Sequence, residues 1–162
     1  MALIVRDANI FIDFEAGGLL NRVFELPEDI AVPDVLFEEE LRARHENLLG
    51  LGLRCLVLRP GAVDRAVELA DRYRRPSRID LTALALAEQE RCALLTGDRF
   101  LRDAAKSEGV EVHGTLWLME RLLDAGLVNV ATAGKAYARM RTAERRLPWD
   151  EVERQVGRMQ GR

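Results

Sequence analysis

The sequence predicts an α/β fold, in which a central parallel sheet of about four to five strands is flanked by helices on both faces. Two observations lead to this expectation. Short apolar runs without polar alternation suit strands that are buried on both faces. Helical patterns separate these runs, and strands joined through helices form a parallel sheet. The length of 162 residues, with 48% hydrophobic and 31% charged residues, suits a globular chain with its own core.

The first half of the chain alternates between the two patterns. Residues 2–5 form an uninterrupted apolar run, and helix-like spacing follows over 9–26 with Gly17 and Gly18 inside it. A second apolar run at 30–32 precedes Pro33 and Asp34, which mark a helix start because aspartate caps free backbone N–H groups. That helix covers 35–49, and a third strand is expected at 53–58, before a helical pattern over 62–74.

The second half continues the alternation. Ser77 and Asp80 have the spacing of a capping box, and the helix over 81–90 is apolar nearly all round, as in a buried helix. Strands are expected at 92–96 and 110–112, with a helix over 99–108 that Asp98 can cap and another over 115–126. We expect a domain over residues 1–130 and a helical C-terminal extension over 131–162, either packed on the domain or extending from it.

Bulk properties exclude several classes of protein. Arg6 and Asp7 interrupt the first apolar run, so we expect no secretory signal, and no run approaches the ~20 residues of a membrane span. We therefore expect a cytoplasmic protein without a membrane partner. The net charge of −3 does not favour nucleic-acid binding as a whole. Two arginine clusters could still hold phosphates, or could be solvated helix faces: Arg72, Arg74, Arg75 and Arg78, and Arg139, Arg141, Arg145 and Arg146.

Acidic residues recur where a parallel sheet places its functional sites. Asp7 follows the first strand, Asp98 follows the fourth, and Asp80 begins the helix that leads into the fourth strand. The helix after the second strand carries three consecutive glutamates, 38–40. Sites in such sheets form outside the carboxyl ends of the strands, so these carboxylates are expected at one edge. Singly, each also has a structural explanation as a helix cap or a solvated residue.

Carboxylates gathered at one edge require a counter-charge. Two of them ~5 Å apart, at an effective dielectric constant of ~20, repel each other by roughly 3 kcal/mol. Mg²⁺ or Mn²⁺ removes this repulsion, because both ions prefer hard oxygen ligands. The chemistry that follows is phosphodiester hydrolysis, in which the metal activates water and one carboxylate can serve as a general base.

Five motifs resemble those of PIN domains, most closely the bacterial and archaeal VapC-like proteins. They are LIVRDANIFIDF, VPDVLFEEEL, RIDLTALALAEQ, ALLTGDRFLRDAA and GVEVHGTLWLMERLLDAGLV, and the resemblance covers about residues 2–128. It implies that Asp7, Asp80 and Asp98 hold the metal, with Asn9 and Thr96 as polar companions. The second acidic residue of the family, a glutamate, falls on Glu40. Glu39 is the alternative, and a buried face through Phe37 and Leu41 favours Glu40.

The resemblance also implies a function. We expect an Mg²⁺- or Mn²⁺-dependent endoribonuclease with Asp7, Glu40, Asp80 and Asp98 as catalytic residues. We expect it to be the toxin of a type II toxin–antitoxin pair, with RNA as substrate, a small antitoxin protein as partner and a homodimeric assembly. The alternative is a catalytically inactive PIN-like module that binds RNA or protein. A phosphatase with an aspartyl nucleophile is disfavoured, because Asn9 stands where such enzymes usually carry a second aspartate. Asp13 is expected to be a polar residue of the helix after the first strand rather than a metal ligand.

Overall fold

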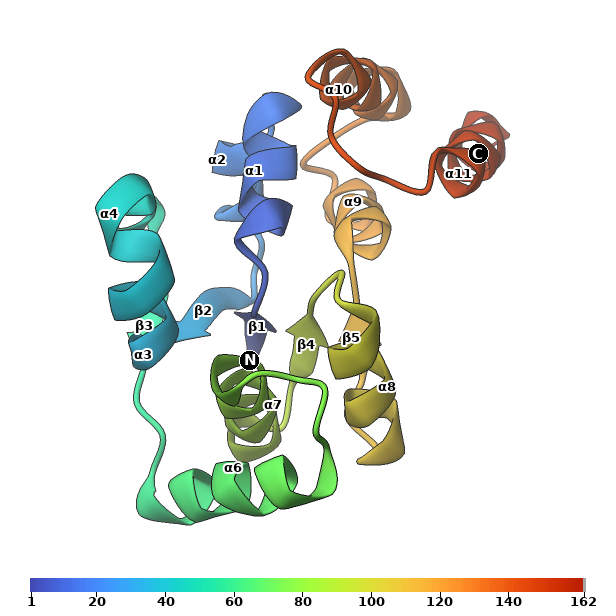
Figure 1. Ribbon diagram of the computed structural model, residues 1–162. Helices are drawn as coiled ribbons and strands as arrows, with labels where there is room; N and C mark the ends of the chain where they lie inside the picture. The colour runs from blue at the N-terminus through green and yellow to red at the C-terminus, as the bar shows by residue number, and fades with distance from the viewer. Residues whose placement is uncertain (162) are drawn as a thin grey trace.

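A five-stranded parallel sheet forms the centre of the molecule in the computed structural model, which describes residues 1–161 (Figure 1). The strands are β1 (Ala2–Val5), β2 (Asp29–Pro33), β3 (Arg54–Leu56), β4 (Ala93–Leu95) and β5 (Val112–His113). Their spatial order is β3-β2-β1-β4-β5, and every pairing is parallel. The predicted fold class is therefore confirmed, and β1 lies at the middle of the sheet.

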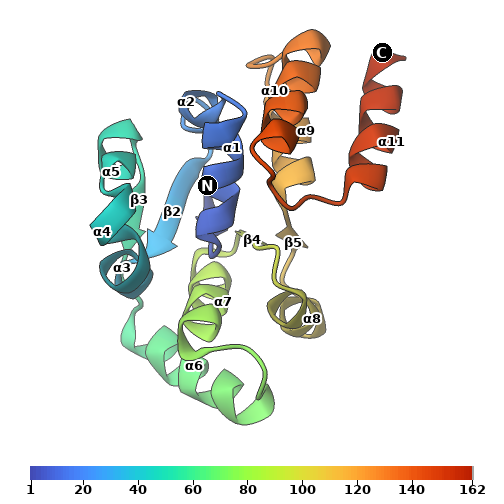
Figure 2. The same ribbon diagram turned by 45° about the horizontal axis from the view of Figure 1, so that its top comes forward.

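Helices cover both faces of this sheet. They are α1 (Ala8–Ala16), α2 (Leu20–Val23), α3 (Asp34–Leu36), the π-helical turn η1 (Phe37–Leu41), α4 (Arg42–His45), α5 (Asn47–Leu51), α6 (Pro60–Arg72), α7 (Arg78–Glu90), α8 (Arg99–Ser107), α9 (Thr115–Asp124), α10 (Val130–Thr142) and α11 (Trp149–Gln160). Figures 1 and 2 show α6, α7 and α8 on one face and α1, α2 and α9 on the other. Within residues 1–161, no helix has the length and apolar character to cross a membrane.

The alternation of side chains along β1 divides the core into two clusters. Leu3 and Val5 pack in the cluster that includes α1 and α9. Ile4 points to the opposite face and packs in the cluster formed mainly with α7 and α8. Because both faces of β1 are buried, its sequence is an uninterrupted apolar run.

The helix α7 is buried nearly all round, as its sequence predicts. It begins at the expected capping box, in which the Ser77 hydroxyl accepts from the Asp80 N–H and the Asp80 carboxylate accepts from the Ser77 N–H. All residues from Leu81 to Ala87 are buried. The N-terminus of α7, and Asp80 with it, therefore has a fixed place beside the sheet.

The C-terminal helices share a core with the first helix. Tyr137 and Met140 of α10 and Val152 of α11 are buried in the same cluster as Phe14 of α1. Contact between α1 and α10 is close at Gly17, where an added Cβ would lie 2.8 Å from the Met140 Cε atom. Residues of α10 and α11 thus form part of the core on this face of the sheet.

Candidate active site

Asp7 and Asp98 begin the helices that follow two neighbouring strands. Asp7 Oδ1 accepts the N–H of Asn9 at 2.9 Å at the start of α1. Asp98 Oδ1 accepts the N–H of Phe100 at 3.3 Å at the start of α8. Because β1 and β4 are adjacent and parallel, both caps lie at the same edge of the sheet. Each capping bond engages one oxygen of its carboxylate.

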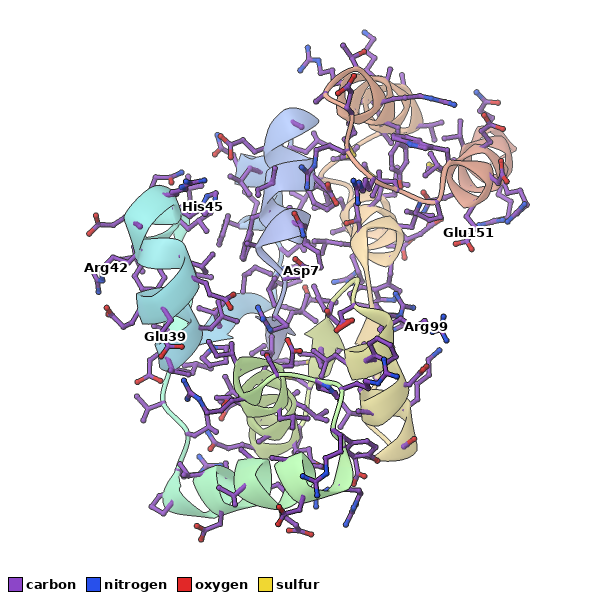
Figure 3. All side chains as sticks on the ribbon, viewed as in Figure 1. Asp7, Glu39, Arg42, His45, Arg99 and Glu151 are labelled. Carbon is purple, nitrogen blue, oxygen red and sulfur yellow. The ribbon has the colours of Figure 1, made fainter. Side chains whose placement is uncertain are left out.

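The two aspartates line one polar pocket of about 870 Å³. Asp7 lies at the base of α1 near the middle of the molecule (Figure 3). An added Cβ at Gly97 would lie 3.5 Å from Asp7 Oδ2, so the loop after β4 passes directly beside this carboxylate. The charged residues that line the pocket are Asp7, Asp13, Asp98, Arg102, Glu144, Arg145, Arg146 and Glu151. The pocket therefore combines an acidic sheet edge with three arginines.

Glu40 and Asp80 lie outside the lining of this pocket and are held by Arg6. Arg6 Nε donates to Asp80 Oδ1 at 2.5 Å, and Arg6 Nη1 donates to Glu40 Oε2 at 2.8 Å. Arg6 precedes Asp7 in the chain, so these two carboxylates are also near the end of β1. The four predicted residues thus form two pairs at one edge of the sheet. Arg6 bonds Glu40 and Asp80, whereas Asp7 and Asp98 line the pocket.

The structure distinguishes Glu40 from Glu39. Glu40 contacts Arg6 at the sheet edge, whereas Glu39 forms an exposed ion pair with Arg78 at 3.1 Å. Both lie in η1, a wide turn of the kind that recurs at functional sites. The two apolar residues that flank the glutamates are buried, as expected: Phe37 and Leu41. Of the two glutamates, Glu40 is therefore the one that shares an arginine with Asp80.

The acidic groups are compatible with a divalent ion that takes only one or two of its ligands from the protein. Within residues 1–161, no group of three or more His, Cys, Asp or Glu side chains is arranged to hold a metal ion. Mg²⁺ commonly keeps several waters and takes only one or two carboxylates, with substrate phosphates completing its shell. Asp7 and Asp98, which line one pocket and use one oxygen each for capping, suit that mode of binding.

Asp13 has a larger role than its sequence position suggests. Its Oδ1 atom accepts from Arg145 Nε at 2.7 Å, and its Oδ2 atom accepts from the Thr115 hydroxyl at 2.8 Å. Burial raises the pKa of Asp13 above its ordinary value, although the bonds from Arg145 and Thr115 oppose that rise. Arg145 also donates to Asn9 Oδ1 at 3.1 Å. Asp13 is thus a polar residue of α1, as expected, and it also joins three segments beside the pocket.

The first arginine cluster is only partly neutralised. Arg72 is paired with Glu108, and Arg78 with Glu39. The other two members, Arg74 and Arg75, form no ion pair with the described part of the chain. In the second cluster, Arg141 and Arg145 are paired, whereas Arg139 and Arg146 form no ion pair within residues 1–161. Each cluster therefore contains cations that remain available to a polyanion.

Phe100 adds an exposed aromatic ring next to Asp98. Its exposed fraction is 40%. Arg75 Cζ lies 4.9 Å and Arg99 Cζ 5.8 Å from the centre of the ring, distances at which guanidinium groups interact with aromatic faces. Sequence reasoning missed this group, because Arg75 and Phe100 belong to different segments of the chain. Arginines interleaved with an aromatic ring are a common feature of nucleic-acid-binding surfaces.

One comparison with known proteins identifies the family of this chain. A family model described as "DUF3368: PIN domain" matches residues 3–160. No curated protein and no solved structure gives a significant match. The family match spans the sheet, both predicted aspartates of the pocket, and the two C-terminal helices.

Proposed function

The chain belongs to the PIN-domain family, whose model matches residues 3–160, and from this premise we propose that it is a divalent-metal-dependent endoribonuclease. PIN domains are generally nucleases, and the five-stranded parallel sheet with helices on both faces is consistent with that fold. The observation that supports the proposal best is the polar pocket, in which Asp7 and Asp98 lie at one sheet edge and arginines line the same space.

In the proposed site, Asp7 and Asp98 would hold the metal ion. Mg²⁺ or Mn²⁺ would supply an activated water and stabilisation of the charge that develops on the leaving oxygen. The backbone N–H groups of Asn9 and Phe100 orient the two carboxylates, because each donates to one of their oxygens. Glu40 and Asp80, held at the same edge by Arg6, complete the acidic set.

The arginines of the pocket have a separate task. A phosphodiester brought to Asp7 and Asp98 carries negative charge toward an edge that is already acidic. Arg102 and Arg146 line the same pocket and form no ion pair within residues 1–161, so they can neutralise the phosphates. Arg145 is held by Asp13 and positions that wall of the pocket. RNA would therefore lie across the acidic edge with its backbone against these cations.

We further propose that the protein is a cytoplasmic toxin of a type II toxin–antitoxin pair, acting as a homodimer that a small antitoxin neutralises. This part of the proposal depends on the resemblance of the motifs around Asp7, Asp80 and Asp98 to VapC-like proteins. Growth arrest on expression, relieved by Asp7→Asn, is the expected result. Equal growth arrest by the wild type and the variant would contradict it.

The central experiment compares Asp7→Asn and Asp98→Asn with the wild type on single-stranded RNA in Mg²⁺ or Mn²⁺. Asparagine can still accept the capping N–H, so both variants should keep the fold while losing charge at the site. We expect metal-dependent cleavage to fall at least 100-fold, and circular dichroism to remain unchanged. Asp103→Asn is the matched control, since Asp103 is an exposed residue of α8 outside the pocket lining.

The alternative of an inactive binding module makes a different prediction. It expects the wild type to bind RNA in EDTA but to show no cleavage with any divalent ion. Wild-type cleavage rates in both Asp7→Asn and Asp98→Asn would also contradict the proposed active site, because the reaction would then not depend on its two central carboxylates.

A further inference from the structure

Arg6 provides an internal cation between two of the acidic residues at the sheet edge. Its guanidinium bonds Asp80 through Nε at 2.5 Å and Glu40 through Nη1 and Nη2 at 2.8 and 3.3 Å. The exposed fractions of the Arg6 and Asp80 side chains are 15% and 12%, so this contact is largely shielded from solvent. The planar guanidinium of arginine directs its N–H donors at fixed angles and so holds the two carboxylates in a fixed geometry. The ammonium group of a lysine does not fix its partners in this way.

The oxygen atoms of this pair are already engaged. Asp80 Oδ1 accepts from Arg6 and Asp80 Oδ2 accepts from the Ser77 N–H at 2.8 Å. Both oxygens of Glu40 accept from Arg6. Asp7 and Asp98, in contrast, each use one oxygen for a helix cap and line the open pocket. The two pairs of carboxylates therefore differ in what they can offer to a metal ion.

We propose that Arg6 is a positioning residue whose guanidinium takes the place of a second metal ion, so that this site binds one divalent ion, at Asp7 and Asp98. The proposal rests on the proposed nuclease function. It departs from the expectation that Asp80 is a metal ligand. The four carboxylates carry a charge of −4, which two divalent ions would balance. Arg6 supplies one positive charge to Glu40 and Asp80, and a single divalent ion balances the remaining pair, so that the four carboxylates keep a net charge of only −1.

The backbone supports this assignment by anchoring Arg6. The Arg6 N–H donates to the Leu95 carbonyl at 2.9 Å, which ties the end of β1 to β4. Its side chain then reaches η1 on one side and the start of α7 on the other. Arg6 thereby fixes Glu40 and Asp80 relative to the neighbouring Asp7, and lysine could not make the same three bonds.

Manganese binding to the full-length protein, measured by electron paramagnetic resonance without RNA, tests the proposal. We expect one Mn²⁺ per chain for the wild type and two for Arg6→Met, because removal of the guanidinium leaves Glu40 and Asp80 to recruit an ion. Added Mn²⁺ should also raise the Tm of Arg6→Met more than that of the wild type, since binding to the folded state stabilises it. A single Mn²⁺ in folded Arg6→Met would overturn the proposal.

Glu40→Gln provides a second test that does not depend on the folding of Arg6→Met. We expect the Mn²⁺ affinity of Glu40→Gln to stay within threefold of the wild type, like that of the matched control Glu39→Gln, whereas Asp7→Asn loses the ion. Loss of the wild-type ion in Glu40→Gln would show that all the carboxylates share that ion. This result would overturn the role proposed for Arg6 but not the proposed nuclease function. A wild type that neither binds Mn²⁺ nor cleaves RNA would overturn the nuclease proposal as well.

Discussion

Arg145 Nε lies 2.7 Å from Asp13 Oδ1, and this contact joins residues that are 132 positions apart in the chain. The Asp13 side chain has an exposed fraction of 6% and that of Arg145 has 23%. The ion pair therefore connects α1 to the loop between α10 and α11 at the edge of the polar pocket. One wall of that pocket depends on the C-terminal region, although all the predicted acidic residues come from the first hundred positions.

Removal of Arg145 should destabilise the fold. Arg145→Met leaves the buried Asp13 carboxylate without its cation, and breaking a buried pair in this way typically costs about 3–5 kcal/mol. Because Arg145 is partly exposed, we expect a loss of about 2–3 kcal/mol in the free energy of unfolding, measured by urea denaturation. Arg146→Met is the matched control, since Arg146 lines the same pocket without an ion pair in residues 1–161. Equal losses in the two variants would contradict the role given to the pair.

The close approach of α1 and α10 predicts opposite effects for two glycine substitutions. At Gly17, an added Cβ would lie 3.2 Å from Ala136 Cβ and 3.3 Å from the Ala136 carbonyl oxygen, so Gly17→Ala should separate the helices and cost about 1–2 kcal/mol. At Gly134 within α10, nothing lies within 4 Å of the added atom. Gly134→Ala should therefore stabilise the protein by about 0.5–1 kcal/mol through helix propensity. Thermal denaturation of both variants measures these signs, and a stabilising Gly17→Ala would refute the packing argument.

Glu108 predicts a pH dependence of stability. Hydrogen bonds from Tyr73, and then from Arg72 and Arg65, lower the pKa of Glu108 from its ordinary 4.5 to about 2. A carboxyl whose pKa is depressed in the folded state stabilises that state above its unfolded pKa. The contribution is lost as the pH falls from about 4.5 toward 2. The Tm difference between wild type and Glu108→Gln should thus be constant from neutral pH to about 5 and then shrink.

Thermal melts across that pH range measure the difference directly. Glu15→Gln is the control, because Glu15 is exposed and forms no ion pair within residues 1–161. Its Tm should follow the wild type throughout. A Glu108→Gln difference that persists unchanged to pH 3 would mean that ionisation of Glu108 does not contribute to folding.

Local patterns allowed the sheet and the positions of the acidic residues to be predicted. An apolar run is a property of consecutive residues, and strands β1 and β4 were expected at the right places, with Asp7 and Asp98 directly after them. The boundaries of β3 and β5 were less accurate. The third strand was expected over residues 53–58, but β3 is an edge strand that covers only Arg54–Leu56, and its Cys55 is exposed.

Contacts between distant segments could not be predicted in the same way. In the sequence, Arg6 only interrupts an apolar run. No residue next to it in the chain indicates that it bonds Glu40 and Asp80, which are 34 and 74 positions away. Asp13 and Arg145 are a second example. A charged residue has many possible partners in the sequence, and only the packing of the helices selects among them.

Phe100 provides a prediction about how RNA is held beside Asp98. A base from a single strand can stack on the exposed ring and on the guanidinium groups of Arg75 and Arg99, and such stacking contributes about 1–3 kcal/mol per base. We therefore expect Phe100→Ala to weaken the binding of a single-stranded oligonucleotide by about tenfold or more. Fluorescence anisotropy in EDTA measures binding without cleavage.

Two controls separate stacking from general effects of the substitution. Val67→Ala removes another exposed apolar side chain, on α6, and should leave RNA affinity unchanged. Phe100→Tyr retains an aromatic ring and should bind like the wild type. Double-stranded RNA hides its bases in the helix, so Phe100→Ala should change its affinity little. Equal weakening for single-stranded and double-stranded RNA would show instead that Phe100 acts only by supporting the arginines that contact phosphates.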